Sequence, residues 1–155
     1  MSICRHPREL MKQDKNKLIA GLGSFQVYKR ETLKDIKLSE NEYFDESYFM
    51  YCEDTDLSLR AREKGWRIES CWEVKILHKQ YGSAKDNTNM IYYAHKNFMR
   101  NTLRHNKLKE LILYSPFIIG ANFIYAPFIL HTKHWKLVIK AKIDGIKEWR
   151  KERSN

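Results

Sequence analysis

The length, composition and charge of the chain limit the classes of protein to which it can belong. Its 155 residues fit one domain. With 43% hydrophobic and 31% charged residues, it has the material for a core, which excludes a wholly disordered protein. The formal net charge of +10 favours partners that carry phosphate, namely nucleic acid, anionic lipid or a nucleotide-linked ligand, without choosing among them.

Cysteine usage excludes further classes. The three cysteines, Cys4, Cys52 and Cys71, are odd in number and widely spaced, and none forms a CxxC pair. This pattern argues against a disulfide scaffold and against a zinc site, and it fits a reducing compartment. The first residues are polar and charged, so no secretory signal peptide is expected.

Three segments are predicted along the chain. They are a polar N-terminal segment at 1–17, an α/β domain at 18–109 and a helical tail at 110–155. Near the start of the domain, an apolar run contains Gly21 and Gly23, which suit a tight turn or the close approach of a ligand. The alternating apolar residues that follow predict a strand at 24–28.

Residues 53–65 carry the clearest local pattern. Three carboxylates open the segment, two arginines stand near its end, and Gly65 follows, as is usual for a helix and its C-terminal stop. Leu57 and Ala61 lie four residues apart and are expected to face the core. Short apolar runs then predict strand structure at 68–77, which ends just before His78.

The second half of the chain is predicted to be helical. A polar helix is expected at 84–109, followed by a stretch at 111–130 without a charged residue, about as long as a membrane-spanning helix. Pro116, Gly120 and Pro127 interrupt this stretch, so a broken hairpin in the membrane surface fits as well as a span. A buried helical pair packed on the domain is the alternative.

The tail, 131–155, is basic and shows helical periodicity. Its larger side chains recur at helical spacing, and most of its lysines fall on other faces: Trp135, Val138, Lys142, Ile146 and Trp149. A basic amphipathic helix of this kind is typical of an anionic membrane surface.

The carboxylates Glu53, Asp54 and Asp56 are the first candidates for chemistry. A carboxylate beside a substrate hydroxyl can take its proton as a general base. Acidic residues are also common at helix starts, where they cap the backbone and interact with the helix dipole. Composition alone therefore favours the simpler interpretation, a solvated helix with an acidic first turn.

The surrounding residues carry a longer pattern. Residues 44–68 read FDESYFMYCEDTDLSLRAREKGWRI, which resembles the segment FDExFFMYxEDxDLxxRxxxxG of rhamnosyltransferase-like members of the inverting family 2 glycosyltransferases. The residues around Gly23-Ser24 and His78 resemble flanking elements of that family. Tyr92-Tyr93 to Asn97 resembles its YYxxRN helix, with Lys96 where arginine is usual. The resemblance covers roughly residues 18–105.

This resemblance implies a GT-A fold, a Rossmann-like α/β domain, of which the chain would be the C-terminal, acceptor-side half. It implies transfer of a sugar from a nucleotide-diphospho-sugar to an acceptor hydroxyl with inversion, in bacterial surface polysaccharide synthesis. Asp54 stands at the position of the catalytic base, and Glu53 and Asp56 would position the acceptor or tune the base. The other candidate site residues are Gly23, Ser24 and Arg60 for donor or acceptor binding, and His78 for Mg²⁺ or Mn²⁺.

The chain departs from the family pattern before residue 18. The family has a nucleotide-binding half with a DxD motif at this place, and the residues before 18 are too few to form it. Donor and metal binding are therefore expected to need a separate N-terminal half, and little transfer is expected from the chain alone. The acceptor is expected to be a saccharide or lipid-linked, at the cytoplasmic face of the inner membrane.

Two other functions compete with this hypothesis. The chain could be a non-catalytic, membrane-bound interaction module or a degenerate remnant of a transferase. Nucleic-acid binding is disfavoured in spite of the charge, because no helix-turn-helix, zinc-finger or RNP-type pattern is present.

Overall fold

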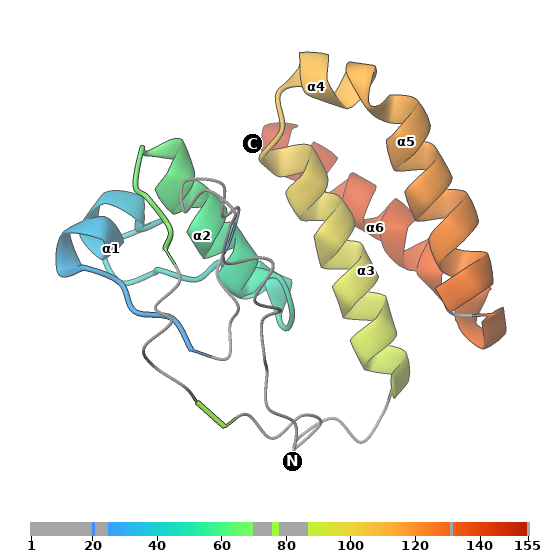
Figure 1. Cartoon of the computed structure of the whole chain (residues 1–155), viewed down its shortest axis with the longest axis horizontal. Coiled ribbons are helices and arrows are strands. Elements are labelled where there is room, and N and C mark those ends of the chain that lie inside the picture. Colours follow the sequence, from blue (N-terminus) through green and yellow to red (C-terminus); the bar gives the residue numbers. More distant parts are fainter. Residues whose placement is uncertain (1–19, 21–24, 70–75, 78–86, 131, 155) are drawn as a thin grey trace. The chain divides into compact units, whose positions relative to one another are not determined.

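The computed structural model describes residues 20, 25–69, 76–77, 87–130 and 132–154, and Figure 1 shows their helices. The chain divides into two compact units. The first unit comprises Met1–Ser47 and Glu53–Lys85, and the second comprises Tyr48–Cys52 and Asp86–Asn155.

In the first unit, two helices share a small apolar core. Helix α1 (Arg30–Ile36) and helix α2 (Glu53–Glu63) meet through Ile36, Leu57 and Ala61, which are all buried. Tyr28 and Trp66 pack against this cluster. The predicted core face of α2 is therefore confirmed.

Helix α2 ends as its sequence predicts. Gly65 adopts a φ of 88°, a left-handed conformation that costs glycine little. The N–H of Gly65 donates to the Arg62 carbonyl at 2.9 Å, and the N–H of Trp66 donates to the Ala61 carbonyl at 3.0 Å. This pair of bonds satisfies the last carbonyls of the helix and turns the chain away from it.

The predicted α/β fold with a partial GT-A sheet is wrong, because the described residues are helical and contain no strand. Residues 26–29 carry no regular structure, and this segment is held by side chains, since Gln26 and Tyr28 bond to Ser58 on α2. A strand requires a partner backbone for its ladder, and no described segment supplies one. Of the second predicted strand, residues 70–75 lie outside the described residues, and 68–69 and 76–77 carry no regular structure.

The second unit consists of helices, beginning with α3 (Asn87–Arg104) and ending with α6 (Trp135–Ser154). Between them lie four shorter elements: α4 (Leu108–Leu113), α5 (Ser115–Ile119), the π-helix η4 (Gly120–Leu130) and the 3₁₀ turn η5 (Thr132–His134). Helix α6 lies along α3 and also contacts η4 (Figure 1). No helix among the described residues is both long enough and apolar enough to cross a membrane.

Three polar contacts at four-residue intervals join α3 to α6. The Tyr92 hydroxyl donates to Asp144 at 2.9 Å, and Lys96 pairs with Glu148 at 2.8 Å. The third pair joins Arg100 to Glu152. Because residue numbers rise together on both helices, α3 and α6 run parallel. Burial and the neighbouring Asp144 carboxylate raise the pKa of Tyr92 to about 12, so its hydroxyl stays a donor.

A buried lysine links α6 to the π-helix. Lys142 is almost fully buried, and its Nζ donates to Oδ1 of Asn122 at 2.6 Å. Asn122 in turn donates to the Ile118 carbonyl at 2.9 Å. Burial lowers the pKa of Lys142 to about 8. The apolar stretch is thus attached to α6 by a polar contact that its own sequence did not reveal.

Gly145 lets α6 approach α3 closely. A Cβ atom added there would overlap the carbonyl oxygen of Lys96 and would lie 3.3 Å from Cβ of Met99. Backbone cannot move aside as a flexible side chain can, so the two helices would have to separate.

We therefore expect Gly145→Ala to lower the free energy of unfolding by about 1–3 kcal/mol, in spite of alanine's better helix propensity. Denaturant unfolding followed by circular dichroism measures this effect. Gly120→Ala is the matched control, because a Cβ at Gly120 meets no atom within 4 Å and should be tolerated. Equal stability of the two variants would contradict the close approach.

Candidate functional site

The three acidic residues in the first turn of α2 have different environments. Asp56 is fully buried, and its Oδ2 accepts a hydrogen bond from Nε of Arg60 at 2.8 Å. The remaining guanidinium nitrogens of Arg60 donate to the carbonyls of Ile36 and Tyr43. This pair joins α2 to α1 and to the loop that follows α1. All of these partners of Arg60 lie within the first unit, so Asp56 and Arg60 form a structural ion pair. A role of either residue in substrate binding stays a prediction.

Asp54, by contrast, is only partly buried. Its Oδ1 accepts hydrogen bonds from the backbone N–H of Thr55 at 2.7 Å and from the Thr55 hydroxyl at 3.3 Å. Within the described part of the chain, no ion pair joins a cation to the Asp54 carboxylate. The neighbouring Glu53 Oε2 finds no hydrogen-bond partner among the same residues. These two carboxylates therefore retain acceptor capacity.

A polar cluster lies beside this face of α2. Ser58 follows Asp54 by one helical turn, and its Oγ is 3.2 Å from the Tyr28 hydroxyl and 3.5 Å from Nε2 of Gln26. The Tyr28 hydroxyl donates to Oε1 of Gln26 at 2.8 Å. Burial raises the pKa of Tyr28 against the opposing hydrogen bond to Ser58, and the charge of Asp54 raises it further. Tyr28 therefore carries its proton at neutral pH.

Sequence reasoning did not identify this cluster. Gln26 and Tyr28 were expected as part of a strand, and Tyr28 also as part of the run at 27–30 that resembles a flanking element of the family, but neither was a candidate site residue. Their position beside Asp54 follows from the packing of residues 26–29 on α2, which is a contact between distant parts of the sequence. Polar side chains beside a carboxylate are suited to orient a hydroxyl group.

Several predicted site residues cannot be placed. Gly23, Ser24 and His78 lie outside the described residues. Among the residues that the structure describes, no three histidine, cysteine, aspartate or glutamate side chains gather into a metal site. A requirement for Mg²⁺ or Mn²⁺ stays a prediction, and no chemical step is assigned to it here.

The five residues before α2, Tyr48–Cys52, form a strained segment that we call the lead-in loop. Phe49, Tyr51 and Cys52 have φ angles of 61°, 63° and 69°, in the left-handed region that residues with a side chain seldom adopt. Each such conformation costs on the order of 1 kcal/mol. Strain of this kind persists only where surrounding contacts enforce it, and it is common at functional sites.

Comparison with known proteins gives one partial similarity. Over 69 residues, or 44% of its length, the chain is 33% identical to Rhamnosyltransferase WbbL of Escherichia coli (strain K12). The matched region spans only 25% of that protein. No protein-family model matches the chain, and no solved structure matches it. The similarity supports a glycosyltransferase-like relation and does not extend to the GT-A fold or to a numbered family.

The different environments of Asp54 and Asp56 predict different effects on stability. Asp56→Asn should lower the free energy of unfolding by about 3 kcal/mol, because it leaves the buried Arg60 without its counter-charge. Asp54→Asn should cost less than about 1 kcal/mol, since only a helix-terminus interaction is lost. Urea unfolding of both variants tests this expectation, and a larger loss for Asp54→Asn would refute the division of roles.

Proposed function

We propose that this chain carries the acceptor-side chemistry of a glycosyltransferase, which moves a sugar from a nucleotide-diphospho-sugar to an acceptor hydroxyl. The observation that carries the proposal is the 33% identity over 69 residues to a rhamnosyltransferase. The partly exposed Asp54, without a cationic partner in the described part of the chain, is consistent with it. Membership of family 2 and an inverting outcome belong to the proposal and rest on the residue pattern at 44–68.

In the proposed reaction, Asp54 takes the proton of the acceptor hydroxyl as the oxygen attacks the anomeric carbon of the donor sugar. The bond from that carbon to the diphosphate oxygen breaks, and the diphosphate leaves with the electron pair. Attack from the opposite face inverts the anomeric centre. Glu53, with an oxygen that lacks a partner among the described residues, would orient the acceptor.

The remaining parts of the reaction are also proposals. The similar region covers a quarter of the rhamnosyltransferase, so donor binding is proposed to involve residues beyond the matched region. A divalent cation, with His78 among its ligands, would neutralise the diphosphate when bound. The donor sugar and the acceptor are left open.

A graft tests the role of Asp54. Residues 44–105 would replace the corresponding segment of Rhamnosyltransferase WbbL, and rhamnosyl transfer from a nucleotide-linked donor would be measured. We expect the graft to transfer rhamnose, and Asp54→Asn to lower kcat by about 100-fold or more, which is the usual contribution of a general base.

Glu63→Gln, in the last turn of the same helix, is the matched control and should leave kcat within about twofold, because it lies outside the acidic first turn. An active graft that is insensitive to Asp54→Asn would exclude Asp54 as the base. A folded but inactive graft would favour the non-catalytic alternative, a membrane-bound interaction module or remnant.

We further propose that the second unit binds the cytoplasmic face of the inner membrane peripherally. Side chains of α4, α5 and η4 form an exposed apolar surface, which we call the apolar ridge: Leu108, Ile112, Leu113, Tyr114, Phe117, Ile119, Ile124 and Tyr125. Phe117 is 75% exposed and Leu113 is 70% exposed. An apolar surface of this kind favours contact with a partner or a membrane.

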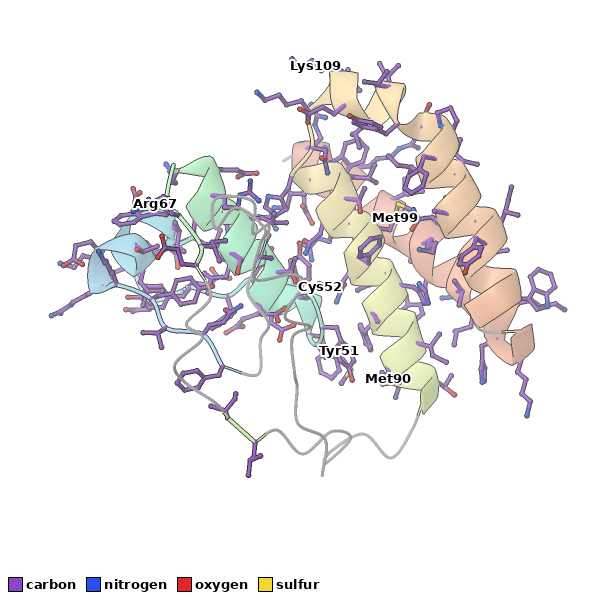
Figure 2. The ribbon with its side chains drawn as sticks, in the orientation of Figure 1. Tyr51, Cys52, Arg67, Met90, Met99 and Lys109 are labelled. Carbon is purple, nitrogen blue, oxygen red and sulfur yellow. The ribbon has the colours of Figure 1, made fainter. Side chains whose placement is uncertain are left out.

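Charge selects an anionic membrane as the partner of the ridge. Lys107 and Lys109 are exposed at the start of α4, where Lys109 extends away from the helix in Figure 2, and Lys133 and Lys136 are exposed beyond η4. Lysines that flank an apolar surface attract anionic lipid headgroups while the apolar side chains enter the interface. The face of α6 that carries Val138 and Lys142 is buried, so it does not contribute.

Vesicle binding tests the ridge. We expect the chain to co-sediment with phosphatidylglycerol-containing vesicles, and Phe117→Ser to weaken the partition about tenfold, as loss of one buried aromatic side chain predicts. Phe25→Ser, at an exposed phenylalanine of the first unit, is the matched control and should have little effect. Equal losses in the two variants, or no binding by the wild type, would contradict the proposal.

A further inference from the structure

Helix α3 presents a buried amide to the lead-in loop. Asn97 is 0% exposed, and its Nδ2 donates to three loop carbonyl oxygens, those of Tyr48 at 2.9 Å, Met50 at 2.7 Å and Tyr51 at 2.9 Å. The amide has two hydrogens, so at least one is shared between acceptors. All three acceptors belong to the backbone, and the contact is therefore independent of the loop side chains.

Asn101, which lies one helical turn further along α3, also binds the lead-in loop. Its Nδ2 donates to the Cys52 carbonyl at 3.1 Å, and its Oδ1 accepts a hydrogen bond from the Tyr48 hydroxyl. Together, Asn97 and Asn101 engage the carbonyls of four of the five loop residues. Figure 2 shows Tyr51 and Cys52 in this loop.

Side chains of α3 also contact the aromatic rings of the lead-in loop. The Arg100 guanidinium lies 4.1 Å from the centre of the Tyr48 ring, and the rings of Phe49 and Tyr93 are 5.0 Å apart. Such contacts anchor the loop, but they do not dictate the left-handed φ angles of Phe49, Tyr51 and Cys52. The bonds from Asn97 and Asn101 orient the loop carbonyls, together with the loop's own bond from the Met50 N–H to the Tyr48 carbonyl at 2.7 Å.

We propose that Asn97 and Asn101 hold the lead-in loop in a conformation that its own residues disfavour, and that the loop opens more often when these contacts are lost.

Cys52 supplies a local probe of the loop. In the full chain with Cys4→Ser and Cys71→Ser, the reaction of the Cys52 thiol with a chromogenic disulfide reports how often the loop opens. We expect Asn97→Ala to accelerate this reaction by about tenfold or more, because several hydrogen bonds are lost together, while helical circular dichroism is retained. Asn106→Ala, at an exposed asparagine just beyond α3, is the matched control and should react like the parent.

A second pair of variants keeps the inference testable if Asn97→Ala fails to fold. Tyr51→Asn should leave the Cys52 reaction rate unchanged, because asparagine tolerates a φ near 63°. Tyr51→Val should accelerate the reaction, because a β-branched residue strongly resists this conformation. Equal rates in the two Tyr51 variants, or an unchanged rate in folded Asn97→Ala, would overturn the proposed hold.

Discussion

A hydrogen-bond donor that is removed from water needs an acceptor, and this requirement organises both units of the chain. In the first unit, the buried Arg60 finds Asp56 and two backbone carbonyls, so that α1, α2 and the loop after α1 converge on one guanidinium. In the second unit, the buried Asn97 finds three carbonyls of the lead-in loop. In both cases one polar side chain determines the path of a distant segment.

The same requirement separates structural from chemical roles among the acidic residues of α2. The carboxylate of Asp56 is committed to Arg60, and a substrate could reach it only by breaking a buried ion pair. Among the described residues, Asp54 accepts hydrogen bonds from its neighbour Thr55 and from no distant residue. One helical turn can therefore both stabilise the unit and present an acceptor for a proton, which is the combination that the proposed transferase chemistry needs.

The second unit combines internal polar contacts with an exposed apolar surface. Its parallel helices α3 and α6 are joined by polar pairs, and the buried Lys142 attaches the π-helix through Asn122. The contact between Lys142 and Asn122 attaches the apolar stretch at 111–130 to α6. Many apolar side chains of the stretch are nevertheless exposed. The unit is thus packed internally and also carries exposed apolar side chains, and their contact with a membrane stays a prediction.

The sequence by itself determined α2 with its stop at Gly65, the helix α3 and the helix α6, because acidic starts, glycine ends and helical spacing act locally. Its residue pattern also pointed to a glycosyltransferase-like relation, which the partial similarity supports. It did not predict that residues 26–29 lack a ladder partner in the described part of the chain, because strand pairing depends on distant backbone. Only the tertiary structure showed that Asp56 is buried against Arg60 while Asp54 is partly exposed, and only it showed the contacts of Tyr28 and Asn97. These contacts join residues that are distant in the sequence, so no local signal predicts them.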